Sequence, residues 1–389
     1  MRTIYRGSVV ETGRVVKNGI VVTEGETIVY VGVEQDYAAR GDETVRDYHG
    51  HWIIPGLIDI HVHGNAGYDV MDGTADSLIE ISRSLSRYGV TGFLATTMTA
   101  PFVEIEKALR AIVETVDSPQ LSAQLLGVHL EGPWINPKLK GAQPEEHIVP
   151  PTAERVEAVL QLLGEKLRVV TIAPEMPEAL QTIGKLSGHG VICSVGHSDA
   201  TIEQVAAAVE RGASHVTHMF NGMRGLHHRE PGVVGAALVN DRLTCDIIAD
   251  FVHVHPNAVE LVYRMKGRER LLLISDGMRA VGMPDGTYEL GGQTVHVHKC
   301  IAHLNDETLA GSTLTLNRAI AHLVETLHLD VHDAVYMAAT APALKLGLGD
   351  HKGSLEAGKD ADLVVLTPDY HVRETVVKGR TVYQEGETA

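Results

Sequence analysis

Two histidines, His61 and His63, end a run of residues that is otherwise typical of a buried strand, IIPGLIDIHVHG (residues 53–64). Alternate residues of a β-strand point to the same face, so the two imidazoles can bind one ion together. Zn²⁺ and similar first-row ions readily accept imidazole nitrogen and carboxylate oxygen as ligands. The spacing therefore suggests a metal site at the end of this strand, although alternation can also place two histidines on a solvent-exposed face.

Other apolar runs of strand length also end in residues that can bind a metal or transfer a proton: Glu131, His197, His218 and Asp276. If these runs are parallel strands of one barrel, their carboxyl ends meet at one rim. Two ions bridged by Glu131 would use five of the six side chains, one ion with the HVH pair and one with His197 and His218. Paired ions can activate a shared water and polarise a carbonyl group, which leaves Asp276 to carry a proton.

Each of these residues has a simpler structural explanation when it is taken alone. A lone histidine at a strand end, such as His129 or His215, is usually a hydrogen-bonded structural residue. Glu131 could form a salt bridge in a loop, and Asp276 could cap a helix. Separate structural roles do not explain why the candidate ligands occupy equivalent positions at the ends of several strands, so a shared site is favoured.

The elements that must position these side chains follow a regular alternation. Amphipathic segments of helical length, such as residues 76–89 and 201–213, separate eight apolar runs: 53–64, 92–97, 125–133, 168–175, 191–198, 215–223, 244–254 and 271–277. Near-continuous apolar strands that alternate with helices predict a parallel sheet covered on both faces, here an α/β (β/α)₈ TIM barrel. An open doubly wound sheet loses support, because no GxGxxG follows the first strand.

The two ends of the chain have a different pattern. Residues 1–52 and 351–389 alternate β-branched and polar residues between glycine-containing turns, and neither segment is long enough to bury a core alone. We therefore expect them to form one small β-sandwich domain, with residues 53–350 as the barrel domain. Residues 278–312 read as a hairpin insertion after the eighth strand.

The charge balance restricts the partners. The 389 residues carry a formal net charge of −17, which argues against nucleic acid as a ligand. An anionic ligand would need a local basic cluster, and the loop NGMRGLHHRE (residues 221–230) after the sixth strand offers one. We expect no membrane association and a cytoplasmic location, because no apolar run reaches about 18 residues and the N-terminus lacks an apolar signal core.

The motifs PGLIDIHVHG, HLEGP, GHSDA, THMFNGM, REPG, SDG, LAGS and KDADLVVL, in this order, resemble those of the amidohydrolase superfamily. Within it, they closely resemble the N-acetylglucosamine-6-phosphate deacetylase family. The resemblance implies a urease-like β-sandwich beside an amidohydrolase-type barrel. It also implies one or two divalent ions (Zn, Fe, Mn or Co) and hydrolysis of the N-acetyl group of a phosphorylated amino sugar.

The same resemblance implies a role for each matching residue. Glu131, His197 and His218 would bind one ion, His61 and His63 would complete a second site, and Asp276 would be catalytic. Substrate contacts would come from Ala142, Gln143, Asn221, Gly222, Arg229, His253, Ala310, Gly311 and Ser312. Arg229 would reach the phosphate bound by a neighbouring subunit, which implies a homodimer. Gln143 departs from the family, in which many members have a histidine, and a glutamine cannot carry charge.

Three alternatives stay open. A deacetylase of N-acetylgalactosamine 6-phosphate differs only in the C4 epimer that it accepts. A cyclic-amide hydrolase of the same superfamily is disfavoured, because such enzymes generally bridge their metals with a carboxylated lysine after strand four, where this chain reads TIAPE (residues 171–175). A catalytically silent binding protein that kept the barrel is the third.

Overall fold

A parallel barrel forms the centre of the molecule in the computed structural model, which describes residues 2–306 and 308–386. Its eight strands lie side by side in chain order: β5 (Leu57–Val62), β8 (Val90–Thr96), β9 (Gln124–Glu131), β10 (Leu167–Ile172), β11 (Ile192–Val195), β12 (Ala213–Val216), β13 (Thr244–Ile248) and β14 (Leu271–Ile274). Every strand overlaps one of the eight apolar runs, and β8, β9, β10 and β12 begin one or two residues before their runs. The first and last strands meet at their carboxyl ends, where the Asp276 N–H donates to His61 O at 2.9 Å.

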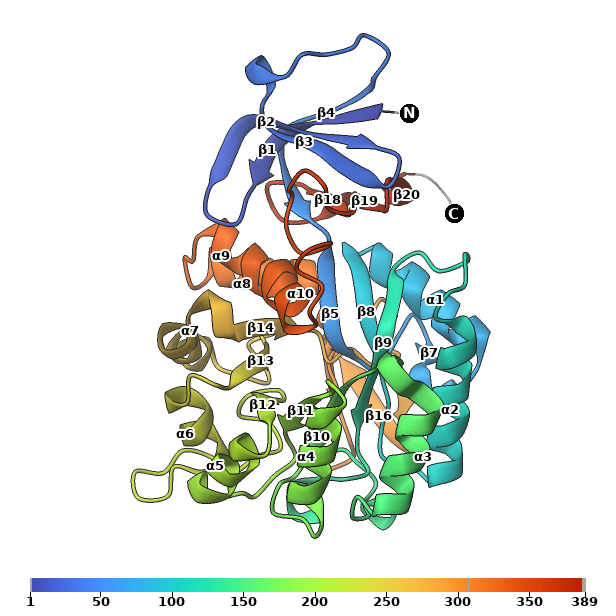
Figure 1. The fold of residues 1–389 in the computed structure, drawn as a ribbon, viewed down its shortest axis with the longest axis vertical. Coiled ribbons are helices and arrows are strands. Elements are labelled where there is room, and N and C mark those ends of the chain that lie inside the picture. The colour runs from blue at the N-terminus through green and yellow to red at the C-terminus, as the bar shows by residue number, and fades with distance from the viewer. Residues whose placement is uncertain (1, 307, 387–389) are drawn as a thin grey trace.

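Helices cover the outside of the barrel (Figure 1). One helix follows each of the first seven strands: α1 (Ala75–Ser86), α2 (Phe102–Thr115), α3 (Ala153–Leu163), α4 (Ala179–Gly188), α5 (Ile202–Glu210), α6 (Gly232–Val239) and α7 (Pro256–Arg270). After β14 come α8 (Leu316–Glu325), α9 (Val331–Val335), a π-helical turn (Tyr336–Thr340) and α10 (Ala341–Lys345). The predicted (β/α)₈ barrel is confirmed.

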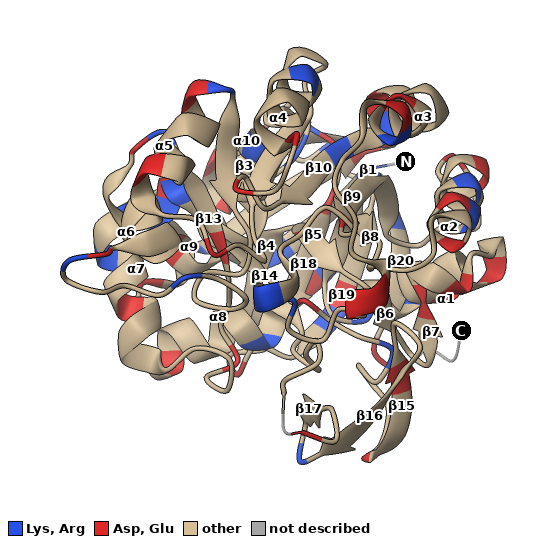
Figure 2. Cartoon of the chain, turned by 90° about the horizontal axis from the view of Figure 1, so that it is seen from below, with Lys and Arg blue, Asp and Glu red and all other residues tan. Residues whose placement is uncertain are grey.

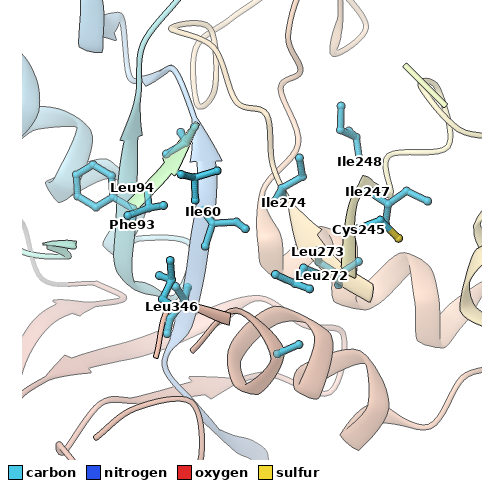
Figure 3. Packing of buried hydrophobic residues seen from close by; sticks show 14 of the residues in the cluster. Ile60, Phe93, Leu94, Cys245, Ile247, Ile248, Leu272, Leu273, Ile274 and Leu346 are labelled. Atoms are coloured by element: carbon cyan, nitrogen blue, oxygen red, sulfur yellow. The ribbon is translucent and has the colours of Figure 1, made fainter. Parts of the chain in front are cut away.

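Aliphatic side chains fill the space around the strands, as a sheet that is buried on both faces requires. Figure 3 shows Ile60 and Leu94 on neighbouring strands β5 and β8, and Ile247 and Leu273 on β13 and β14. All four side chains are fully buried. Packing of this kind leaves the strand ends as the place where polar side chains can gather.

The two ends of the chain form one seven-stranded sheet on the side where β5 enters the barrel (Figure 1). Its strands are β1 (Arg2–Val10), β2 (Val15–Glu24), β3 (Thr27–Val33), β4 (Thr44–Pro55), β18 (Leu363–Leu366), β19 (Val372–Val377) and β20 (Arg380–Gln384). β4 joins the halves, since it pairs in parallel with β1 and antiparallel with β18. Tyr5 and Ile53 share a core with Leu363 and Val376. The predicted small β-domain built from both termini is confirmed, and the strands of the expected sandwich pair as one continuous sheet whose halves share a core.

The insertion after β14 is a three-stranded antiparallel sheet of β15 (Gly286–Leu290), β16 (Gln293–His298) and β17 (Ile301–His303). It lies beside the carboxyl end of the barrel, the end that Figure 2 views. The remaining short elements are β6 (Gly64–Asn65), β7 (Tyr68–Asp69), η1 (Glu34–Asp36), η2 (Val70–Asp72), η3 (Pro137–Leu139), η4 (Glu145–His147) and η5 (Gly164–Lys166). Among the described residues, no helix combines the length and apolarity needed to cross a bilayer.

Candidate active site

Six buried side chains, at or just beyond the carboxyl ends of five strands, meet at one end of the barrel and form what we term the ligand cluster: His61, His63, Glu131, His197, His218 and Asp276. Glu131 lies at its centre. Its Oε1 is 3.1 Å from His218 Nε2 and 3.4 Å from His197 Nε2, and its Oε2 is 3.3 Å from His63 Nε2. The structure therefore brings together all six residues that the strand ends had suggested.

The ligand cluster divides into two groups of three. Glu131, His197 and His218 form one group, and His61, His63 and Asp276 form the other, with the ligand atoms of each group within 4.8 Å of one another. Asp276 Oδ1 lies 3.4 Å from His61 Nε2 and 3.3 Å from His63 Nε2. The Asp276 carboxylate is therefore close enough to both histidines to contact an ion that they bind.

The orientation of two imidazoles fits a divalent cation in the first group. His197 Nδ1 lies 2.8 Å from Leu139 O, and His218 Nδ1 lies 3.1 Å from Asn221 O. A carbonyl oxygen only accepts, so Nδ1 carries a proton in both rings, and Nε2 is the atom that each ring offers to an ion. The two Nε2 atoms lie 3.1 Å apart beside a carboxylate, a mutually repulsive set that a divalent cation would stabilise.

The second group lacks this outer support. Among the described residues, neither His61 Nδ1 nor His63 Nδ1 has a hydrogen-bond partner, and both atoms are buried. An outer hydrogen bond fixes the tautomer and orientation of a ligating histidine. The group of Glu131, His197 and His218 is therefore the better prepared of the two.

Electrostatics in the ligand cluster favour positive charge. Burial lowers the pKa of His218, but the hydrogen bond with Glu131 and the negative charges of Glu131, Asp276 and Asp246 together bring it to about 9, so an ion that binds at Nε2 must displace a proton. Burial likewise raises the pKa of Asp276, but the charge of His61 and the hydrogen bond with His63 bring it to about 2. The carboxylates thus stay ionised and attract cations into the cluster.

Three members of the ligand cluster have left-handed backbone conformations, with φ of 46° at His197, 32° at His218 and 49° at Asp276. Such strain costs about 1–3 kcal/mol per residue and persists only where the surroundings impose it. Two buried acids that sequence reasoning missed supply part of that restraint. Asp246 accepts the His218 N–H, while Asp59 accepts the His61 N–H at 3.2 Å and the Ser275 hydroxyl at 2.5 Å. Their signal in the sequence is an acid inside an apolar strand run.

The two histidines expected to be structural make hydrogen bonds away from the ligand cluster. His129 contacts Ile60 O at 3.0 Å and Thr171 Oγ1 at 2.8 Å, and burial lowers its pKa to about 3. His215 contacts Asp246 Oδ2 at 3.0 Å. Both rings therefore link neighbouring barrel strands through hydrogen bonds.

A cavity that is open to solvent lies over the ligand cluster. Of the residues predicted to contact substrate, its lining includes Ala142, Gln143, Asn221, Gly222, His253 and Gly311. Ala310 and Ser312 are buried and do not line it. The Ser312 N–H instead donates to Asp276 O at 2.7 Å, and its hydroxyl donates to Ser275 O at 2.5 Å. Ser312 thus holds the backbone that carries Asp276.

Gln143 and Gly222 are tied to the ligands themselves. Gln143 accepts the Thr99 N–H at 2.7 Å and donates its amide to Glu131 Oε2 at 2.9 Å. A Cβ at Gly222, where φ is 55°, would lie 2.8 Å from His197 Nδ1, so only glycine fits beside that ring. Both residues therefore restrain a ligand from the cavity side.

Arg229 is not brought to the cavity of its own chain. It is exposed in the loop between β12 and α6, and its guanidinium contacts His228 Nε2 at 2.7 Å. Figure 2 shows this loop projecting from the rim beside α6.

Comparisons with known proteins agree with this geometry. The model of the Amidohydrolase family matches residues 52–382. The N-acetylglucosamine-6-phosphate deacetylase of Bacillus subtilis is 40% identical over 97% of this chain and 96% of its own length. The N-acetylgalactosamine-6-phosphate deacetylase of Escherichia coli is 41% identical, covering 84% of this chain and 87% of its own. A mutant of the N-acetyl-D-glucosamine-6-phosphate deacetylase of Mycobacterium smegmatis, solved in complex with N-acetyl-D-glucosamine 6-phosphate, superposes with a TM-score of 0.92 at 31% identity, over 98% of this chain and 100% of that one.

Substitutions at the two groups should separate their contributions to ion binding. Glu131→Gln should reduce bound metal to background after loading with Zn²⁺, because Glu131 contacts ligands of both groups. His61→Ala should retain the ion held by Glu131, His197 and His218. Elemental analysis of the purified variants measures both, with His189→Ala on the outer surface as the control. Full metal content in Glu131→Gln would contradict the assignment.

Proposed function

The chain belongs to the amidohydrolase family, and from that premise we propose that it hydrolyses the N-acetyl group of N-acetyl-D-glucosamine 6-phosphate, releasing D-glucosamine 6-phosphate and acetate. The observation that carries the proposal is the position of Asp276. Its carboxylate lies within 3.4 Å of the imidazoles of His61 and His63, on the wall of a cavity that also contains Asn221 and Gly222. A proton carrier beside an ion-binding group is what amide hydrolysis requires.

The protein's own residues divide the work of the reaction. When bound, a divalent ion supplies the Lewis acidity that activates water and polarises a carbonyl group. Asp276 accepts the proton of the attacking water at its carboxylate and then donates it to the leaving nitrogen, so one residue serves as base and then as acid. The hydrogen bonds from Ser312 and to His61 O hold the Asp276 backbone during both transfers.

Side chains around the cavity orient the substrate. His253 is held by Asp250, whose Oδ2 lies 2.7 Å from His253 Nδ1, so the ring keeps one orientation against the sugar. Asn221 and Gly222 would bind the phosphate, because they line the cavity next to His197 and their loop continues into the basic residues. Gln143 contributes by orienting Glu131.

The proposal also includes a divalent metal ion, a homodimeric assembly and a cytoplasmic location. Zn²⁺, Fe²⁺, Mn²⁺ and Co²⁺ all suit these ligands, and the site holds one ion in the better prepared group or two when the second group fills. The enzyme would act as a homodimer in which each Arg229 reaches the neighbouring cavity. It would work in the cytoplasm, because a phosphorylated sugar carries charge that opposes passage through a bilayer.

A second candidate substrate is N-acetyl-D-galactosamine 6-phosphate. It is favoured by the Escherichia coli relative, whose 41% identity is as high as the 40% of the Bacillus subtilis relative. The two sugars differ only at C4, so their separation requires a direct assay.

The assay measures free amine and acetate after incubation of the Zn²⁺-loaded protein with the two sugar phosphates and with unphosphorylated N-acetylglucosamine. N-acetyl-D-glucosamine 6-phosphate should be cleaved fastest. Faster cleavage of the galactose epimer would replace the proposal with the second candidate, and release from neither would overturn both.

Asp276→Asn should lower kcat by roughly 10²–10⁴-fold, since it removes the proton carrier. Near-normal turnover in that variant would remove the role assigned to Asp276.

Arg229→Ala should raise KM for the phosphorylated sugar about tenfold or more, the size expected for a lost charged hydrogen bond. It should leave KM for the unphosphorylated sugar unchanged. Arg242→Ala, which removes an exposed arginine paired with Glu210, is the matched control. Equal effects on both sugars would count against a phosphate contact.

Mixing subunits tests whether Arg229 acts across the dimer. A hybrid of Arg229→Ala and Asp276→Asn subunits has one cavity with both residues intact, so a random 1:1 mixture assayed at substrate well below KM should recover about a quarter of full activity. An arginine that serves its own cavity would give no recovery.

A further inference from the structure

Glu175, at the end of TIAPE three residues beyond β10, makes contacts that the proposed reaction does not use. Its Oε1 accepts the Asp199 N–H at 2.6 Å and the Asn136 side-chain amide at 2.8 Å. Its Oε2 accepts the Ser198 hydroxyl at 2.7 Å. One carboxylate therefore receives three donors from two different loops.

Both loops hold His197. Ser198 and Asp199 follow it directly in the chain, so their bonds to Glu175 fix its backbone from the carboxyl side. Asn136 fixes it from the other loop, because the Asn136 N–H donates to His197 O at 2.9 Å. The strained backbone of His197, with φ of 46°, thus lies between two segments that Glu175 joins.

The second loop also orients the His197 ring. Asn136 caps the short η3 turn by accepting the Lys138 N–H at 2.9 Å, and the turn ends at Leu139. Leu139 O is the atom that lies 2.8 Å from His197 Nδ1. Glu175 therefore anchors both the backbone of this ligand and the carbonyl that sets its tautomer.

Glu175 acts through hydrogen bonds and not through an ion pair. Within the part of the chain that the structure describes, no lysine or arginine nitrogen lies within 4 Å of it, whereas neighbouring Asp199 pairs with Lys138 and Arg224. A glutamine could keep all three contacts, because its carbonyl can accept two N–H groups and its amide can donate to the Ser198 hydroxyl. Residue 175 therefore needs a side chain of this length that can make the three hydrogen bonds, more than it needs a negative charge.

We propose that Glu175 is a positioning residue, which presents His197 Nε2 to the ion shared with Glu131 and His218. Partners of this kind behind a ligand commonly contribute 10–100-fold to metal affinity. The inference rests on the proposed function only where catalytic rates are used, since ion binding can be measured without a substrate.

The test starts from the Zn²⁺-loaded protein and measures its affinity by competition with a chromophoric chelator. Glu175→Ala should bind Zn²⁺ roughly 10–100-fold more weakly, and Glu175→Gln should stay within about threefold of the unmodified protein because it keeps the three contacts. Glu157→Ala is the matched control, since it removes a carboxylate that accepts from Lys185 and Gln161 on the outer face of α3. Unchanged affinity in Glu175→Ala, or equal losses in the alanine and glutamine variants, would overturn the proposal.

Thermal unfolding separates positioning from a purely structural role. A residue that only stabilises the fold lowers Tm equally with and without Zn²⁺, whereas a weakened site reduces the rise in Tm that Zn²⁺ produces. Glu175→Ala should show the smaller rise, and an undiminished rise would contradict the proposal. If that variant does not fold, Ser198→Ala removes one of the three contacts and should reduce Zn²⁺ affinity in the same direction. No loss there would also overturn the proposal.

Catalytic rates give an independent reading. Glu175→Ala at saturating Zn²⁺ should lower kcat while leaving KM for the phosphorylated sugar within about threefold, because its contacts lie behind the ligand and not on the substrate. A rise in KM alone would contradict this. Absence of acetate release by the unmodified protein would defeat the proposed function and leave the Zn²⁺ measurements standing.

Discussion

Imidazole Nε2 atoms and carboxylate oxygens face one another at 3.1–3.4 Å in a buried space, and the rest of the structure is arranged around that contact. Such groups repel unless a cation lies among them. Holding them together needs a rigid frame, and that frame imposes strain on the backbone of the ligands. Left-handed backbone at His197, His218 and Asp276 is one sign of that strain.

The barrel supplies the convergence and the loops supply the orientation. Parallel strands deliver their last residues to one rim, and the rim closes through the hydrogen bond from Asp276 N–H to His61 O. Behind the rim, carbonyl groups of Leu139 and Asn221 fix the tautomers of two ligands. The terminal sheet continues directly from β4 into β5, so the strand that ends in the HVH pair starts from a second folded unit.

Much of this could be predicted from residue types and their spacing. Apolar runs of strand length that end in His, Glu or Asp identify both the barrel and its ligands, because strand periodicity and burial act locally. Contacts between loops carry no such signal: Gln143 donates a hydrogen bond to Glu131 from another loop, and Glu175 joins two loops that are distant in the chain. The resemblance to known deacetylases identified Gly222, but its steric reason, the approach of His197 Nδ1, depends on tertiary structure.

The central claim is that Glu131, His197 and His218 hold a divalent ion through the atoms that already face one another. Diffraction from Zn²⁺-loaded crystals at the zinc absorption edge tests it most directly. The account predicts an anomalous peak about 2.0–2.2 Å from Glu131 Oε1 and from Nε2 of both histidines. A peak bound elsewhere, or a His197 ring turned so that Nδ1 leaves Leu139 O and faces the ion, would contradict it.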